Sequence, residues 1–191
     1  QVLSNMGLFD EALAIQQRAL AVHTLVERDE PSALLRLAEL YNKTHHPEEA
    51  LKTLLYVDRN TQLVDKSRRY RLEADAHRDL GAIKEAESSY KRAATGGEEA
   101  PLARRALGIM LADDDRCKQA IPLLKQDEDR DAQLTLARCQ IRESDPESAL
   151  QTSLAILDSV EDPWTQEQAT WLAAVASVRG PQPPAPLPEN A

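Results

Sequence analysis

The chain has 191 residues, of which 42% are hydrophobic and 29% charged, a composition that excludes disorder throughout. Its net charge of −9 opposes general attraction to nucleic acid or to an anionic membrane surface, so we predict no nucleic-acid partner. Only 4% of the residues are aromatic and only 6 are glycine. Strands and hairpins draw on those residues, whereas the abundant Ala, Leu, Glu, Gln and Arg favour helices, so we expect an all-α protein.

Targeting signals are not evident. No apolar run approaches the ~18–20 residues that span a bilayer, which predicts no direct membrane insertion of this chain. The first residue is Gln1, without the charged and apolar regions of a leader after it, and we expect that any targeting segment has been removed. The sequence by itself therefore leaves localisation open.

A short pattern recurs along the chain: acidic or polar residues, then alanine, then apolar residues at helical spacing. The alanines of the five occurrences are Ala12, Ala50, Ala86, Ala120 and Ala149. The gaps between them are 38, 36, 34 and 29 residues, which scatter around ~34. A helix precedes each alanine except the first, where most of it is missing. Each complete unit is therefore predicted to be a helix, a turn and a second helix.

Turn and capping residues mark where these helices begin and end. Pro31 opens the first helix of the second unit, and the turn at 44–47 follows it. Gly81 is a favoured helix C-terminal residue in the third unit. The charged run 125–131 should end the second helix of the fourth unit near Lys125. We expect a local change in superhelical twist there.

A last helix is predicted over 164–179, opened by Asp162 and Pro163. Trp171, Leu172 and Val175 are expected to seal the last repeat as a cap, or as the first helix of another unit. We favour cap packing over a sugar-binding platform for Trp164 and Trp171 as well. The prolines from 181 onwards cannot form a helix and predict an extended linker or tail.

Two stretches of this pattern resemble the tetratricopeptide repeat family. They comprise Leu37, Ala38, Tyr41 and Ala50 in one unit, and Gly81, Ile83, Ala86, Tyr90 and Ala93 in the next. The resemblance implies an all-α fold, an α-α superhelix (solenoid) of antiparallel helix pairs. The resemblance itself covers roughly 1–160. The solenoid domain is expected over 1–179, with about five units and a capping helix and with the first unit truncated, and 180–191 are expected to form a proline-rich linker or tail.

The resemblance also implies where a partner binds, because the first helices of such repeats line a concave groove. Transferring the groove positions gives basic candidates at Arg68, Arg71, Arg78, Arg105, Arg138 and Arg142, with apolar candidates at Leu35, Leu134 and Ile141, and at Leu102. Arginine pairs two-fold with a carboxylate, so we expect a protein partner with an acidic or carboxylate-bearing segment. The alternative is that these arginines pair with Asp75, Asp79 and Asp131 as ordinary surface ions.

Catalytic chemistry is not indicated. The sequence lacks phosphate-binding, zinc-protease and nucleophile-elbow motifs, so we predict no catalytic residues, no cofactor and no metal. His45 and His46 are interpreted as a solvated loop, His77 as a packed histidine, and the acids 113–115 as a solvated turn. Cys117 and Cys139 are interpreted as small buried side chains between helices, with neither a disulfide framework nor a zinc site indicated.

These observations favour a non-catalytic scaffold that mediates protein–protein interaction within a larger assembly. The style of the repeats is similar to that of bacterial envelope proteins, including the repeat region of exopolysaccharide-export proteins. That resemblance implies a periplasmic role in exopolysaccharide secretion, recruiting a polysaccharide-modifying enzyme. We therefore prefer the bacterial periplasm as the compartment, with the cytoplasm as the alternative. Two alternatives are a regulatory module of a larger enzyme or transcription regulator, and a self-association module acting through the first repeat or through Trp164 and Trp171.

Overall fold

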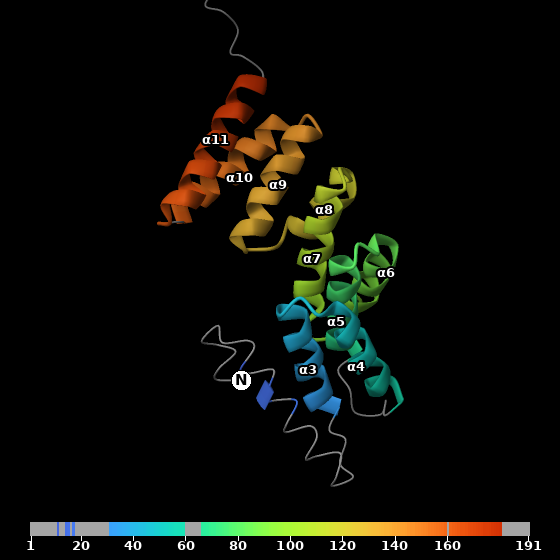
Figure 1. The fold of residues 1–191 in the computed structure, drawn as a ribbon. Helices are drawn as coiled ribbons and strands as arrows, with labels where there is room; N and C mark the ends of the chain where they lie inside the picture. Colours follow the sequence, from blue (N-terminus) through green and yellow to red (C-terminus); the bar gives the residue numbers. More distant parts are fainter. Residues whose placement is uncertain are drawn as a thin grey trace, which may run out of the picture. The chain divides into compact units, whose positions relative to one another are not determined.

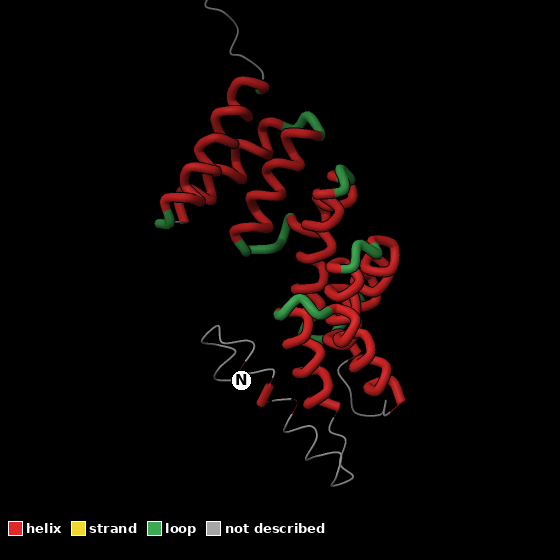
Figure 2. The backbone as a smooth tube through the Cα atoms, in the orientation of Figure 1, coloured by secondary structure: helices red, strands yellow, loops and turns green. Residues whose placement is uncertain are grey.

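The computed structural model describes residues 11, 14, 15, 17, 31–59, 66–159 and 161–180. Within these ranges every regular element is an α-helix (Figure 2). Most of the first unit that the repeat pattern predicts, and the proline-rich segment after Gly180, lie outside the described residues. No described helix combines the length and the apolar character that crossing a membrane requires.

The helices, labelled as in Figure 1, follow the predicted order of pairs. They are α3 (Pro31–Lys43), α4 (Pro47–Arg59), α5 (Lys66–Asp79), α6 (Ile83–Ala93), α7 (Ala100–Asp113), α8 (Cys117–Leu124), α9 (Arg130–Arg142), α10 (Pro146–Ser159) and α11 (Pro163–Arg179). The chain divides into two compact units, Gln1–Arg104 and Arg105–Ala191, whose boundary falls within α7.

In the first unit, α3 packs on α4 and α5 packs on α6, while α5 also contacts both helices of the preceding pair. Its core is formed by Leu34, Leu35, Ala38, Leu54, Val57 and Leu72. Ala38 and Ala74 are fully buried. A small side chain at these positions lets the packed helices approach each other closely.

In the second unit, α9 packs against α8, α10 and α11, and α10 also packs on α11. Its core combines Leu134, Ala137, Ile141, Ala149, Ile156, Ala169, Leu172 and Ala176. A close crossing lies between α7 and α8, where a Cβ built on Gly108 would come within 2.6 Å of Leu124. As predicted from the charged run that follows it, α8 is short and ends at Leu124.

The two helices of each described pair are joined by the same turn. Its middle residue has a positive φ in every case: 57° at His45, 73° at Gly81, 57° at Asp115 and 62° at Ser144. The following N–H donates to the carbonyl five residues earlier, from His46 to Tyr41, Ala82 to His77, Arg116 to Leu111 and Asp145 to Gln140. This is the Schellman closure of a helix C-terminus. The sequence predicted it at Gly81, where glycine marks the site, but not at the three other residues.

The prediction that both tryptophans serve as cap packing is wrong. α11 begins at Pro163 with Asp162 as its N-cap, as expected, and Leu172 is buried. Trp164 and Trp171, however, are 67% and 63% exposed. The helix packs a face of smaller residues against α9 and α10. The tryptophans lie on a different face of the helix, which is exposed.

The two cysteines also differ from their sequence interpretation. They are buried, as expected, but Cys117 on α8 and Cys139 on α9 form a disulfide, with their Cα atoms 5.0 Å apart. The sequence separation of 22 gave no short spacing to recognise. Their proximity follows from the packing of α8 on α9, which places the first turn of one helix beside the last turns of the other.

Candidate functional site

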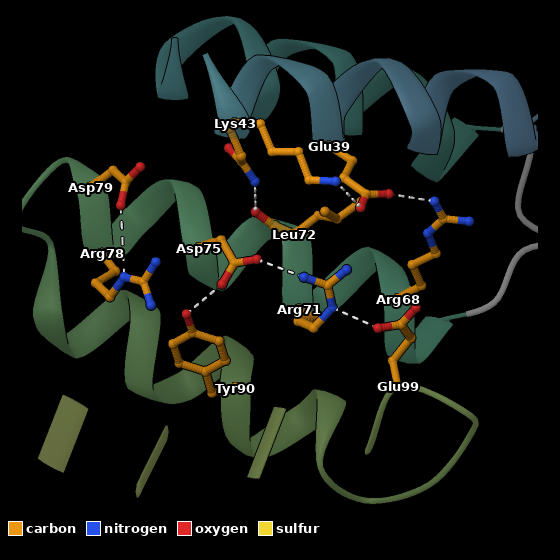
Figure 3. Close-up of polar contacts among 11 residues, drawn as sticks. Glu39, Lys43, Arg68, Arg71, Leu72, Asp75, Arg78, Asp79, Tyr90 and Glu99 are labelled. Atoms are coloured by element: carbon orange, nitrogen blue, oxygen red, sulfur yellow. Dashed lines mark hydrogen bonds and ion pairs between the residues drawn. The ribbon is translucent and has the colours of Figure 1, made fainter. Parts of the chain in front are cut away.

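The arginines on α5 lie in a network of ion pairs within the first unit, shown in Figure 3. Arg68 donates to Glu39 on α3 at 2.6 Å, and Lys43 lies 3.2 Å from the other oxygen of the same carboxylate. Arg71 donates to Asp75 at 2.9 Å. These contacts join α3 to α5 and stiffen α5 itself.

Two further groups complete the network around Arg71. Its Nε donates to Glu99, 2.7 Å away, in the segment before α7. Tyr90 on α6 donates its hydroxyl proton to the other oxygen of Asp75 at 2.5 Å. Arg71 therefore links three segments of the first unit, and its side chain is only 16% exposed.

The pKa values reflect this enclosure. Burial opposes the charge of Arg71, but the nearby carboxylates of Asp75 and Glu99 outweigh it and raise its pKa. Burial and the charge of Asp75 raise the pKa of Tyr90 well above its ordinary value. Burial would raise the pKa of Glu39, yet the hydrogen bond from Arg68 and the charge of Lys43 lower it. These groups keep their hydrogen-bonding states near neutral pH, as a structural network requires.

Arg78, the remaining candidate on α5, is more accessible. Its side chain is 45% exposed, and its nearest carboxylate, Asp79, is 3.7 Å away. Of the pairings with nearby acids that the sequence left as an alternative, Arg71 with Asp75 and Arg78 with Asp79 are present. The Arg71 side chain is 16% exposed and the Arg78 side chain 45%, so only the second pair resembles an ordinary surface ion pair.

Arg105 in the second unit is likewise engaged. It contacts both oxygens of Asp127 at 2.8 and 2.9 Å and one oxygen of Asp129 at 2.8 Å. The hydrogen bond to Asp127 is the main cause of its raised pKa. Asp129 is also the N-cap of α9. Arg105 therefore ties α7 to the loop that starts α9.

Arg138 and Arg142 differ because they line a small polar pocket. The pocket encloses about 110 Å³ between the end of α7 and α9 and is lined by Ala112, Asp113, Thr135, Arg138, Cys139 and Arg142. Arg138 is exposed and donates to the hydroxyl of Thr135 at 2.9 Å. Among the residues that the structure describes, it has no carboxylate within salt-bridge distance. Arg142 contacts the carbonyl of Ala112 at 3.4 Å and the carboxylate of Asp115.

The apolar candidates are less available than the sequence suggested. Leu35 lies in the core of the first unit, and Leu134 and Ile141 lie in the core of the second. All three are buried, whereas Leu102 on α7 is 43% exposed. Burial leaves the three core residues as supports of the helices that carry the arginines, with little surface for a partner.

Sequence reasoning missed the acidic partners of three arginines. Glu39 lies 29 residues before Arg68, Glu99 lies 28 residues after Arg71, and Asp127 lies 22 residues after Arg105. A signal was present for Glu39 and Glu99, because separations only a little shorter than one repeat bring residues of neighbouring helix pairs together. Intrahelical spacing alone pointed only to Asp75 and Asp79.

A second, larger cleft was not anticipated. It encloses about 380 Å³ and is lined by Lys125, Gln126, Asp127, Glu128, Arg130, Gln133, Ala155, Ile156 and Ser159. It lies where the early end of α8 leaves space beside the end of α10. Its two basic and two acidic side chains balance, so it favours neither sign of ligand.

The other polar candidates lie at turns and helix ends. His45 and His46 are exposed in the turn between α3 and α4, and the acids 113–115 are exposed at the end of α7 and in the turn that follows it. His77 is partly buried, with its ring 4.0 Å from the carboxylate of Glu73. Within the described ranges, no three His, Cys, Asp or Glu side chains gather in a way that could hold a metal ion.

Comparison with solved structures places the fold among tetratricopeptide-repeat proteins. The C-terminal part of a TPR repeat-containing protein from Cytophaga hutchinsonii matches with a TM-score of 0.72 at 14% identity, over 93% of this chain and 69% of that one. A thermophilic TPR protein of Thermus thermophilus matches with a TM-score of 0.64 at 20% identity, covering 91% and 93% of the two chains. MamA matches with a TM-score of 0.58 at 14% identity, covering 93% and 91%.

These matches show the fold class: an all-α solenoid of antiparallel helix pairs similar to tetratricopeptide repeats. No family model and no curated protein matches the sequence. At these identities the likeness concerns the fold alone, because the repeat pattern records how helices pack and not what they bind.

Proposed function

We propose that this chain is a non-catalytic scaffold that binds a protein partner, and that the pocket between α7 and α9 receives a carboxylate of that partner. The observation that carries the proposal is Arg138, an exposed arginine that lines this polar pocket together with Asp113 but forms no ion pair with any carboxylate in the described part of the chain. Its guanidinium can donate two parallel hydrogen bonds to a carboxylate. The repeat fold supports the coarser part of the proposal, since stacked helix pairs offer extended surfaces.

Arg142 would supply the second contact. Its present partner, Asp115, is 83% exposed, and Arg142 itself is 57% exposed. An ion pair so open to water contributes only about 0–1 kcal/mol, so an incoming carboxylate can replace Asp115 at little cost. Arg68, Arg71 and Arg105 are excluded from this role because their charges are already matched by enclosed carboxylates.

The experiment measures binding of a fluorescein-labelled peptide that ends in two glutamates and a free carboxylate. We expect saturable binding that weakens with added salt, and at least about tenfold weaker binding when Arg138→Glu is introduced. The same peptide with an amidated C-terminus separates recognition of the terminal carboxylate from recognition of acidic side chains.

Arg104→Glu is the matched control, because Arg104 is an exposed arginine of α7 outside the pocket and the change of charge is identical. It should bind the peptide like the unaltered chain. Equal weakening by both variants would mean that net charge alone attracts the peptide and would refute the pocket. Affinity capture from the native cell extract, with and without Arg138→Glu, would then identify the natural partner.

The finer assignment, a periplasmic scaffold of exopolysaccharide secretion that recruits a modifying enzyme, is a second candidate supported by the disulfide. Disulfides persist in oxidising compartments such as the bacterial periplasm and are rare in the cytosol. The test is alkylation of free thiols in denaturant, directly after acid precipitation of native cells has trapped the redox state, because both side chains are buried in the folded chain. Protection of Cys117 and Cys139 would favour the oxidising compartment, and labelling of both would argue for the cytoplasm.

A further inference from the structure

The last described helix, α11, has two apolar faces. One consists of Ala169, Leu172 and Ala176, which pack into the core of the second unit. The other contains Trp164, Trp171 and Val178, which are 67%, 63% and 77% exposed. We call these three residues the apolar stripe. A helix that is apolar on both sides is typically covered on both sides.

The stripe has the spacing of a helix–helix seam. Its members are separated by seven residues each, so they lie on one line along the helix, about 21 Å long. Trp171 stands midway between Trp164 and Val178. This even spacing makes the stripe complementary to itself when a second, identical helix runs in the opposite direction.

We propose that a second copy of this chain covers the stripe, with the two α11 helices antiparallel and Trp171 on the two-fold axis. In that register Trp164 of one copy meets Val178 of the other. The pair buries three large apolar side chains from each copy, and burial of each removes its apolar surface from water. Two tryptophans meet at the centre, where interfaces concentrate their binding energy.

Charge supports the same arrangement. Arg179 at the C-terminal end of α11 is exposed, as are Glu161 and Asp162 at the other end. An antiparallel second helix brings each Arg179 beside the acidic pair of the other copy. It also places the C-terminal end of each helix dipole beside an N-terminal end, which is favourable. A parallel pair would bring like charges together at both ends, so the charges select the antiparallel direction.

The test is the mass of the full chain in solution, measured by sedimentation equilibrium over the range from about 1 to 500 μM, which brackets the affinity of a small interface. The unaltered chain should rise from 21.2 kDa to twice that mass. Its fluorescence should shift to shorter wavelength over the same range, because both tryptophans of the sequence lie in the stripe. Trp171→Glu and Trp171→Lys should each remain monomeric, since like charges would meet on the axis.

A mixture of the two charged variants should recover the doubled mass, because Glu of one copy then faces Lys of the other. Recovery also shows that both variants are folded. Leu55→Glu, on the 61% exposed Leu55 of α4, is the control and should associate like the unaltered chain. Three results would each overturn the proposal: a monomer at all concentrations, equal loss with Leu55→Glu, or no recovery in the mixture. A monomer with shielded tryptophans would point instead to residues 181–191 as the covering segment.

Discussion

The hydroxyl of Tyr90 on α6 donates a hydrogen bond to Asp75 on α5, with 2.5 Å between the two oxygens. Tyr90 is fully buried, and Asp75 holds Arg71 with its other oxygen. The Tyr90 hydroxyl therefore helps to hold Asp75 in its ion pair with Arg71. The two helices of this pair are joined by a polar contact at their crossing as well as by apolar packing.

Tyr90→Phe should lower the free energy of unfolding by about 1.5–3 kcal/mol, because a largely buried carboxylate loses a hydrogen bond while the ring packing is kept. Urea unfolding followed by circular dichroism measures the change. Tyr41→Phe is the control, since the hydroxyl of Tyr41 accepts an exposed hydrogen bond from Gln17, and it should cost less than about 0.5 kcal/mol. Equal effects of the two variants would contradict a special role for the Tyr90 contact.

Gly108 is a second position where a small change should have a large effect. A Cβ there would meet the side chain of Leu124 at 2.6 and 2.7 Å, and Leu124 is fully buried. Alanine in a helix normally gains about 1 kcal/mol over glycine. Overpacking of a core costs about 1–3 kcal/mol, so Gly108→Ala should be destabilising on balance.

The matched control for this variant is Gly96→Ala. A Cβ on Gly96 meets nothing within 4 Å, so this substitution should be neutral or slightly stabilising. Thermal unfolding of both variants distinguishes the close crossing of α7 and α8 from a general effect of replacing glycine. Stabilisation by Gly108→Ala would mean that the two helices separate easily at this point.

Local signals predicted the helices well, and contacts between helices poorly. Pro31 and Pro163 marked helix starts because proline acts on its own backbone. The contact of Arg71 with Glu99 depends on how one helix pair sits beside the next segment, which periodicity within a helix does not encode. Trp171 was misplaced for a related reason: α11 has two apolar faces, and spacing alone does not show which one packs inward.

Because the four turns have the same backbone geometry, introducing glycine in one turn and removing it from another should change the free energy of unfolding in opposite directions. Ser144 has a φ of 62° and bears the steric cost of a left-handed backbone, about 1–2 kcal/mol for a residue with a Cβ. Ser144→Gly should therefore raise the free energy of unfolding by about 0.5–1 kcal/mol, since glycine also loses more freedom on folding. Gly81→Ala, at a φ of 73° and with open space around its Cβ, should lower it by about 1 kcal/mol. Urea unfolding of both variants tests the equivalence, which two changes of the same sign would contradict.

The disulfide between Cys117 and Cys139 should stabilise the second unit. It closes a loop over a sequence separation of 22 residues, and restricting such a loop in the unfolded chain contributes about 3 kcal/mol. Dithiothreitol should lower the unfolding midpoint of the unaltered chain. Replacing both cysteines by alanine should lower the midpoint similarly, and dithiothreitol should then have no further effect.

Two readouts locate this stabilisation. The fluorescence of Trp164 and Trp171 reports on the second unit, because both tryptophans lie on α11. Ala93→Ser is the control, because Ala93 is buried in α6 and the variant perturbs the first unit. Loss of the disulfide should lower the unfolding midpoint that tryptophan fluorescence reports. Ala93→Ser should leave that midpoint unchanged and should lower the midpoint at which the helices of the first unit lose their circular dichroism signal. If reduction left the fluorescence transition unchanged, the bond would not constrain α8 and α9.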